Sequence, residues 1–261
     1  MKTEEDAALV DFIGAGGWGY FRVPGEDSLA AYSRAFRFVE VNSTFYRHPG
    51  LRQVVDWRRR VPEDFTFSVK AHSAVTHREC LVPTAAALES FARSVAVAHA
   101  LRAPVLILET PASLRFTANK VRDLTALLTS ADRRALTFGL EARAHATGEL
   151  PPPLERAMLD LGIVDVTDLS RQPPRIPAEV AYTRLFGKGE HNRWIFSDTE
   201  LEEIAAARKR TGADRAFYTF HGVRMYKDAA RFLLRETRPE NASWRGPGQQ
   251  VLGLVAARFS P

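Results

Sequence analysis

Polar side chains interrupt and end one apolar run of this sequence, in residues 39–46. Glu40 and Asn42 alternate with valines there, and Thr44 and Tyr46 follow them. A buried strand rarely carries a carboxylate and an amide without a partner or a task, because both groups lose hydration on burial. This stretch therefore indicates a functional site.

Other apolar runs of the chain also end in charged or aromatic residues. These residues are Trp18, Lys70, His72, His77, Glu109, Glu141, Arg143, Arg184 and His221. Any single charge is explained equally well by an ion pair that fills the protein interior. Glu40 with Lys70 is one such pair, and Glu141 with Arg184 is another. The whole set is harder to explain by packing, since each buried charge is costly unless it is paired. Together these residues predict a charged pocket.

We expect this pocket to bind a small anion and to transfer protons. Lys70, Arg143 and Arg184 are the candidate anion ligands, because a guanidinium group binds phosphate or carboxylate through two parallel N–H groups. Glu40, Glu141 and Lys70 are the candidate catalytic residues, since two carboxylates in different environments divide general acid and base work. The other predicted substrate-binding residues are Trp18, Asn42, Thr44, Tyr46, His72, His77, Glu109 and His221.

The sequence lacks the short motifs of several enzyme classes. It has no HExxH or HxH pattern and no cluster of cysteine and histidine, so the spacing predicts no metal ligands. A divalent metal held by carboxylates and histidines of separate strands stays an open alternative, and no cofactor is predicted. The absence of GxSxG and of a P-loop argues against serine hydrolases and P-loop nucleotidases.

The apolar runs alternate with helical patterns along the whole chain. We expect strands at 10–14, 36–42, 65–71, 104–109, 136–141, 163–167, 181–186 and 216–221. Helices are predicted at 28–35, 51–60, 85–101, 119–130, 154–161, 197–212 and 227–235. Alternation of this kind predicts a parallel sheet with right-handed crossovers. Eight such units in about 250 residues predict an α/β fold, a single-domain (β/α)8 TIM barrel, whose active site lies at the carboxyl ends of the strands.

A dinucleotide-binding fold is the rival prediction. Residues 14–19 fit GxGxxG after a strand, and Glu40 lies about 20 residues further on, as a ribose-binding acid would. That loop must open directly into a helix, but residues 20–25 contain Pro24 and Gly25 and have no helical period. The barrel is therefore the better prediction.

Composition limits the class of protein and its partners. The chain has 261 residues, a formal net charge of +5 and one cysteine, Cys80, which suits a reducing cytoplasm. No secretory signal and no apolar run of membrane-spanning length is present, so we expect a cytoplasmic protein without a membrane partner. The basic residues are scattered, which favours a small anion over a polynucleotide. The sequence does not decide whether the chain self-associates.

Four segments resemble one known family. VEVNSTFYRHP at 39–49, FTFSVKAHSAVTH at 65–77, YTRLFG at 182–187 and FSDTEL at 196–201 are similar to the YecE-like family, domain of unknown function 72. The resemblance implies a TIM barrel and little about activity. It implies a barrel domain at 11–238, between an N-terminal extension at 1–10 and a C-terminal tail at 239–261 that packs on the barrel or on a partner. The chain departs from the family pattern at Gly16, His72, Glu109, Phe186 and His221.

Four functions follow from these observations. The first is an enzyme of hydrolase or isomerase type that acts on a small phosphate- or carboxylate-bearing substrate. The second is a nucleic-acid-binding protein or nuclease, with Trp18, Tyr46, Trp194 and the loop 188–193 in a basic groove. The third is a glycoside hydrolase that uses Glu109 with Glu141. The fourth is a non-catalytic scaffold, in which the buried charges are paired off.

Overall fold

The computed structural model describes residues 10–189 and 192–236. Most of the predicted N-terminal extension, the predicted C-terminal tail and residues 190–191 of the loop 188–193 lie outside the described residues.

In the part of the chain that the structure describes, eight parallel strands form a barrel, as the alternating pattern predicts. Their hydrogen-bonded order is β6-β5-β4-β3-β2-β1-β8-β7. An isolated parallel bridge between Thr167 and Thr183 joins the two ends of this order, so the sheet closes into a ring. The strands are β1 (Val10–Ala15), β2 (Phe38–Val41), β3 (Thr66–Lys70), β4 (Val105–Thr110), β5 (Thr137–Ala142), β6 (Val164–Asp165), β7 (Val180–Leu185) and β8 (Arg215–Phe220).

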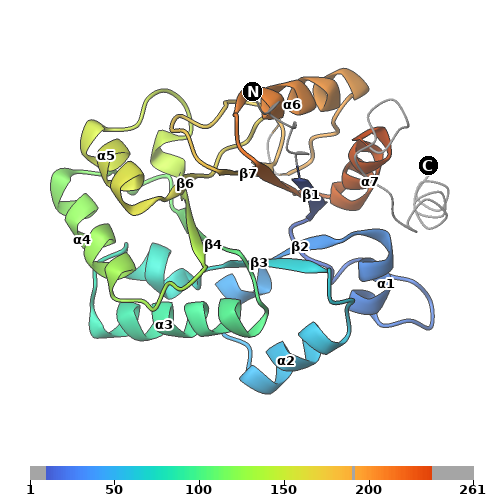
Figure 1. Cartoon of the computed structure of the whole chain (residues 1–261), viewed down its shortest axis with the longest axis horizontal. Coiled ribbons are helices and arrows are strands. Elements are labelled where there is room, and N and C mark those ends of the chain that lie inside the picture. The colour runs from blue at the N-terminus through green and yellow to red at the C-terminus, as the bar shows by residue number, and fades with distance from the viewer. Residues whose placement is uncertain (1–9, 190–191, 237–261) are drawn as a thin grey trace, which may run out of the picture.

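Seven helices of the described residues surround the ring in chain order, and they confirm the predicted (β/α)8 architecture (Figure 1). They are α1 (Ser28–Ala35), α2 (Leu51–Arg59), α3 (Ala85–Ala100), α4 (Ala118–Thr129), α5 (Pro152–Leu161), α6 (Asp198–Arg210) and α7 (Met225–Glu236). Side-chain caps fix several helix starts, among them the reciprocal capping box of Ser197 and Glu200 at α6. Helix α5 ends at Gly162, whose φ of 57° is left-handed and therefore suits glycine.

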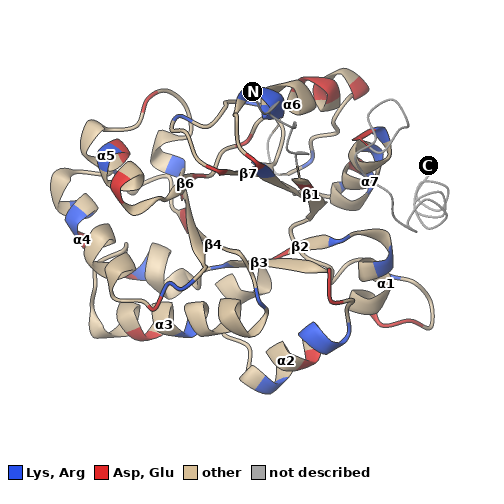
Figure 2. Cartoon of the chain, viewed as in Figure 1, with Lys and Arg blue, Asp and Glu red and all other residues tan. Residues whose placement is uncertain are grey.

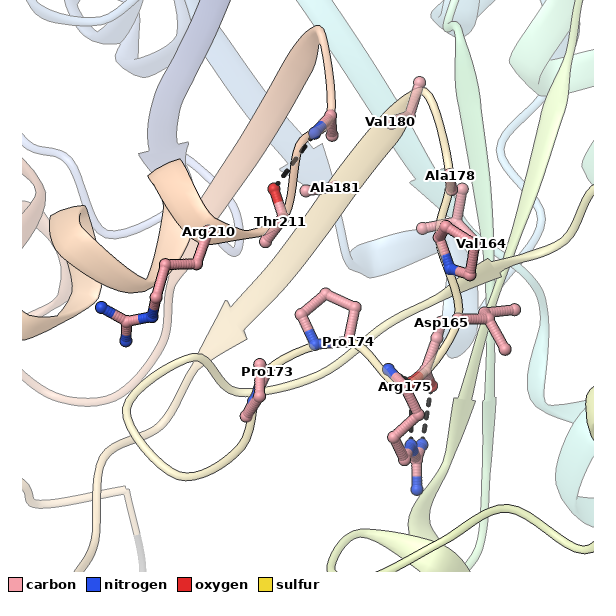
Figure 3. A pocket seen from close by; sticks show the side chains of 13 residues that line it. Val164, Asp165, Pro173, Pro174, Arg175, Ala178, Val180, Ala181, Arg210 and Thr211 are labelled. Carbon is pink, nitrogen blue, oxygen red and sulfur yellow. Dashed lines mark hydrogen bonds and ion pairs between the residues drawn. The ribbon is translucent and has the colours of Figure 1, made fainter.

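The outer layer lacks a helix at one place, between β6 and β7. Residues 166–179 form a loop there, with prolines at 173, 174 and 177. Arg175 fastens this loop to β6, because its Nη2 and Nε lie 2.6 and 2.8 Å from the two carboxylate oxygens of the buried Asp165. A cleft of about 220 Å³ lies between this loop, the starts of β6 and β7 and the end of α6 (Figure 3).

The interior of the ring is filled by side chains that alternate along each strand. Phe38, Ile107, Tyr182 and Phe217 belong to an apolar cluster inside the ring, and Phe12 stacks on Phe217 at 4.7 Å between ring centroids. This cluster fills the barrel toward the amino ends of the strands. Because successive side chains of a strand point to opposite faces, the residue two positions further on faces inward as well.

Candidate functional site

The inward positions next to the carboxyl ends of the strands carry charge instead of apolar groups. Glu40 follows Phe38 by two residues, Glu109 follows Ile107 by two, and Arg184 follows Tyr182 by two. By the same alternation Lys70 and Glu141 reach this layer from β3 and β5. Figure 2 shows charged segments on strands inside the ring of helices as well as on the helices themselves. The strand period thus explains why residues from five strands meet in one layer.

The guanidinium group of Arg184 is the centre of this layer. Its Nη2 and Nε donate to Oε1 and Oε2 of Glu40 at 3.0 and 3.1 Å. Its Nη1 donates to both Glu109 and Glu141. Arg184 is 2% exposed and therefore spends its donors on protein carboxylates. We call Glu40, Lys70, Glu109, Glu141 and Arg184 the charge cluster.

Lys70 and Arg143 extend the charge cluster toward β4 and β5. Lys70 Nζ lies 2.9 Å from Oε2 of Glu109 and 3.9 Å from the ring centroid of Phe45. Arg143 begins the short helix η3 (Arg143–His145), directly after β5. Its Nη1 lies 3.4 Å from Glu109 and its Nε lies 3.8 Å from Glu141. The carboxylates of the cluster are therefore balanced by three cations from different strands and loops.

Glu40 is held from the other side by neutral groups. The hydroxyl of Tyr182 donates to Glu40 at 2.9 Å and lies 2.7 Å from the hydroxyl of Ser68. His221 Nε2 lies 3.7 Å from Glu40, and its ring stacks on Phe186 at 4.5 Å. These contacts close the β7 and β8 side of the layer over Glu40.

Gly16 leaves the space that the His221 ring fills. A Cβ at position 16 would lie 2.2 Å from Cε1 of His221, which no real contact allows. Two of the five departures from the family pattern, Gly16 and His221, are therefore in direct contact, and another, Phe186, stacks on the same ring.

Burial and neighbouring charges move the acid pKa values in opposite directions. Burial alone would raise the pKa of Glu109, but Arg184 and Lys70 outweigh it and lower that pKa to about 2. The pKa of Glu40 is lowered as well, since the positive charges of Arg184 and Lys70 outweigh its burial. The pKa of Glu141 is raised, because the effect of burial is larger than the opposing effect of Arg184. The negative charge of Glu109 raises this pKa further. Glu141 is thus the acid of the cluster that takes up a proton most readily.

The pKa values of Lys70, His221 and His77 are shifted toward the neutral forms, whereas the glutamates raise the pKa of Arg184. Burial, with the nearby positive charge of Arg184, lowers the pKa of Lys70, and Glu109 opposes this shift. Burial and Arg184 lower the pKa of His221 to about 3, so its imidazole is neutral at physiological pH. Burial also lowers the pKa of His77.

The layer is closed at Glu40 and open at β5. The Glu40 side chain is 0% exposed, whereas that of Glu141 is 15% and that of Arg143 is 47% exposed. The charges of Glu40 and Arg184 are buried and fully paired, as they would be in a non-catalytic interior. On the β5 side Glu141 and Arg143 are partly exposed, and their charges are less completely paired. A small molecule that enters at the carboxyl ends of the strands therefore meets Arg143 and Glu141 first.

Seven of the predicted site residues meet here, and His77 lies at their edge through Phe45, with 4.9 Å between ring centroids. Others have different surroundings. Trp18 packs on Trp57 and Phe67 instead of facing the charge cluster. Tyr46 is 74% exposed.

Three further predicted residues lie beside the layer. Thr44 Oγ1 contacts the carbonyls of Val41 and Lys70 at 2.6 and 2.7 Å, which ties the ends of β2 and β3 together. The Nδ1 atom of His72 accepts from the Ala74 amide at 3.1 Å, and the ring stacks on His48, so His72 orders the loops behind the layer. Asn42 Oδ1 is buried and has no hydrogen-bond partner among the described residues.

The sequence prediction missed Tyr182 and Ser68. Both precede a predicted site residue, Arg184 and Lys70, by two positions on the same strand. The strand period would have found them, since it places them on the inward face. The described residues contain no group of three or more histidine, cysteine or acidic residues arranged to hold a metal ion.

Comparisons with known proteins identify the family of this chain. The family described as "Protein of unknown function DUF72" matches residues 12–243. This chain belongs to the DUF72 family. It is 33% identical to the UPF0759 protein YunF of Bacillus subtilis (strain 168) over 79 residues, which are 28% of each protein. The alignment thus spans under a third of that curated relative.

Solved structures share the fold at low sequence identity. The DUF72 family protein TM1631 of Thermotoga maritima is 21% identical, with 88% of this chain and 100% of that chain covered and a TM-score of 0.67. A D-psicose 3-epimerase solved in the presence of D-fructose is 11% identical, with 88% and 100% covered and a TM-score of 0.59. At these identities the likeness concerns the barrel alone. No helix among residues 10–189 and 192–236 has the length and apolar character needed to cross a bilayer.

Proposed function

We propose that this chain is an isomerase-type enzyme that moves a proton on a small, anionic, carbohydrate-like substrate. The observation that carries the proposal is the row Lys70, Glu109 and Glu141 on the neighbouring strands β3, β4 and β5. Its two outer members have pKa values shifted toward neutrality, downward for Lys70 and upward for Glu141. Isomerisation and epimerisation need such a pair, one group to remove a proton beside a carbonyl and one to return it.

The charge cluster assigns a separate role to each of its members. Glu141 is the catalytic acid and base, because it is the most exposed carboxylate of the cluster and its pKa is raised. Lys70 is the second proton-transfer group, and Glu109 keeps it oriented at 2.9 Å. Glu40 is fully buried against Arg184, so both are positioning residues in this proposal. Arg184 would then hold the carboxylates in place rather than the substrate.

Arg143 is the residue best placed to bind the anionic group of the substrate. Its side chain is half-exposed and lies between Glu109 and Glu141 at the open side of the layer. A phosphate or carboxylate bound there through two N–H groups would leave the reacting carbon next to Glu141. The DUF72 chain also shares its barrel with a sugar epimerase, which supports a carbohydrate-like substrate by analogy of fold.

Glycoside hydrolysis by Glu109 and Glu141 fits the geometry less well. A glycosidase needs its two carboxyl groups on either side of a sugar, about 5–9.5 Å apart. Here Nη1 of Arg184 donates to both carboxylates and fills the space between them. Hydrolysis by another route stays the second candidate.

Hydrogen–deuterium exchange on carbon tests the proposal without knowledge of the product. The protein is incubated in D2O with a panel of aldose phosphates, ketose phosphates and sugar acids, and loss of the C–H signal beside the carbonyl is followed by NMR. We expect exchange with at least one member of the panel. In Glu141→Gln the rate of this exchange should fall by roughly 100-fold or more. Arg143→Gln should raise KM far more than it lowers kcat.

Glu149→Gln is the matched control, because Glu149 is an exposed carboxylate of the same loop after β5. It should exchange at the wild-type rate. Absence of exchange across the whole panel, or wild-type exchange in Glu141→Gln, would contradict the proposed proton transfer.

A further inference from the structure

A strained turn follows β3 and carries His77 at the carboxyl end of the barrel. Residues Ala74–Arg78 form a π-helical turn directly after this strand. Cys80 and Leu81 come next and have left-handed φ angles of 49° and 66°, although neither is glycine. Leu81 is fully buried, so packing holds this backbone in place. Such turns and such φ angles concentrate at functional sites, because their cost persists only where the surrounding structure enforces it.

The Phe45 ring connects His77 to the row of proton-transfer groups. The rings of His77 and Phe45 lie 4.9 Å apart between centroids and are nearly perpendicular, at 83°. Lys70 Nζ lies 3.9 Å from the centroid of the same Phe45 ring. The charges of Glu109, Lys70 and Arg143 also act on the pKa of His77, so its imidazole is within electrostatic reach of the row. His77 is partly exposed whereas Lys70 is buried, and His77 therefore borders the open part of the site.

Thr76 determines which nitrogen of His77 carries the hydrogen. Thr76 is fully buried, and its Oγ1 lies 2.9 Å from Nδ1 of His77. Within the described ranges the Thr76 hydroxyl has no other acceptor, and a buried donor without an acceptor is costly. The hydroxyl therefore donates to Nδ1, and the neutral ring keeps its hydrogen on Nε2. Burial, with the positive charges of Lys70 and Arg143, lowers the pKa of His77 against the opposing charge of Glu109, so the ring is neutral at physiological pH.

We propose that His77 is the electrophile of the isomerisation and donates its Nε2–H group to the carbonyl oxygen of the substrate. This inference rests on the proposed function and adds to it the group that stabilises the developing negative charge. When the Glu141 carboxylate removes the proton from carbon, the C–H electron pair forms a C=C bond and the carbonyl π pair moves onto oxygen. A donor already aimed at that oxygen lowers the barrier. Return of a proton to the carbon restores the carbonyl group, and His77 neither gains nor loses a proton.

A neutral imidazole suits this role better than an imidazolium would. Lys70 and Arg143 already bring positive charge to this side of the site, and a charged His77 would be repelled by both. The neutral ring offers one N–H donor at Nε2 without adding charge. Its other nitrogen is occupied by Thr76, so the ring has a fixed orientation toward a ligand.

Nitrogen–proton correlation NMR of the histidine rings tests the tautomer in the full chain without any substrate. The spectrum of His77→Gln assigns the His77 signal by its absence. We expect a neutral ring with its hydrogen on Nε2 at neutral pH, and in Thr76→Val part of the population should change to the Nδ1–H form. Hydrogen on Nδ1 in the wild type, or an imidazolium at neutral pH, would overturn the inference whatever reaction the protein catalyses.

The C–H exchange assay tests whether this N–H group acts on the substrate. His77→Phe keeps an aromatic ring against Phe45 and removes the donor. We expect kcat for exchange to fall by roughly 100-fold or more, with KM changed by less than about threefold. His77→Gln restores an N–H donor and should recover about tenfold of that loss. His99→Phe is the matched control and should exchange at the wild-type rate, because His99 is a partly exposed histidine near the end of α3 whose Nε2 lies 2.9 Å from the Asp132 carbonyl.

The outcomes separate this inference from the proposed function. Exchange that survives unchanged in His77→Phe would overturn the role of His77 and leave proton transfer by Glu141 standing. An equal loss in His77→Phe and His77→Gln would also overturn it, since the loss would then come from packing. Absence of exchange in the wild type would overturn the proposed function and this inference together.

Discussion

Among the described residues, two arginines are fully buried, and they lie at opposite ends of the barrel. Both side chains are 2% exposed. Arg208, in α6, reaches one carboxylate, Asp11 of β1, with its Nε 3.0 Å from Oδ1, and donates to the carbonyl of Ala213 at 2.7 Å. Arg184, in β7, meets the carboxylates of Glu40, Glu109 and Glu141.

The two arginines therefore have different roles. The ion pair of Arg208 holds structural elements together, whereas the ion pairs of Arg184 gather several charges in one place. Arg208 has one carboxylate for one cation, and it connects α6 to β1 and to the turn before β8. Arg184 has more carboxylates than it can neutralise, so further cations must enter the layer, and burial of each of them is costly. A protein interior does not need this surplus for packing, which is why we place the function at the Arg184 end.

Removal of Arg184 should cause the largest loss of stability. Arg184→Met leaves three carboxylates in a layer where the most exposed of them is only 15% exposed. An uncompensated buried charge costs about 3–5 kcal/mol, and here the charges also repel each other. We expect the free energy of unfolding, measured by urea denaturation, to fall by at least about 4 kcal/mol. A loss below about 1 kcal/mol would show that the carboxylates do not depend on Arg184.

Removal of Arg208 should cost less. Arg208→Met leaves Asp11, whose side chain is 24% exposed and therefore keeps some hydration, and one carbonyl without its donor. We expect a loss of about 2–3 kcal/mol in the same denaturation experiment. If Arg208→Met cost more than Arg184→Met, the comparison between the two ends would be reversed.

Acid should weaken the charge cluster through Glu109. Its pKa is about 2 in the folded protein, against an ordinary value of 4.5. The unfolded chain therefore binds more protons than the folded one in this range, and stability that is complete above pH 4.5 is lost as the pH falls toward 2. The loss amounts to about 3 kcal/mol.

Glu109→Gln should remove this part of the pH dependence of the unfolding free energy. Glu63→Gln is the control, because that side chain is 91% exposed and forms only a surface pair with Arg102. If the unfolding free energy of Glu109→Gln depended on pH as steeply as that of the wild type, Glu109 would not be a cause of the acid sensitivity.

The smallest expected effect concerns the contact between Gly16 and His221. Gly16→Ala places a Cβ 2.2 Å from the His221 ring and should cost about 1–3 kcal/mol by overpacking. His221→Ala in the same chain should abolish most of that cost, because the ring is no longer there, so the two changes should be non-additive. Gly19→Ala is the control, since nothing lies within 4 Å of a Cβ at that position. Additive effects would show that the two residues act independently.

The arrangement of the barrel and most of its charged layer follow from local sequence patterns. Apolar runs and helical periods predict eight strands and the helices between them, and a period of two places Glu40 and Arg184 inside. What the patterns leave undetermined is which charges pair. Arg184 is predicted to bind an external anion, but it is surrounded by three carboxylates that arrive from other strands, and no spacing along the chain reveals that encounter.

Other differences have similar physical causes. The predicted strand 163–167 is reduced to β6, because Thr167 forms only an isolated bridge with Thr183. His72 ends an apolar run exactly as Lys70 does, but its ring turns toward His48 and Ser90 outside the ring of strands. Whether a residue just past a strand end turns inward depends on the loop that follows, and loop geometry is not encoded in a period.

The loop between β6 and β7 is a natural place to split this barrel into two fragments. No helix covers residues 166–179, and the ring closes there through one isolated bridge, whereas β7 and β8 pair along their whole length with each other and β8 with β1. A chain cut within this loop would yield a six-strand fragment and a two-strand fragment. Their mutual contacts would include the β1–β8 ladder, the packing of α7 on β1, the pair of Arg208 with Asp11 and the shared interior. Arg184 belongs to the smaller piece and its glutamates to the larger. Reassembly of the two pieces would therefore restore both the ring and the charge cluster in one step, which makes the charge cluster a natural reporter of complementation.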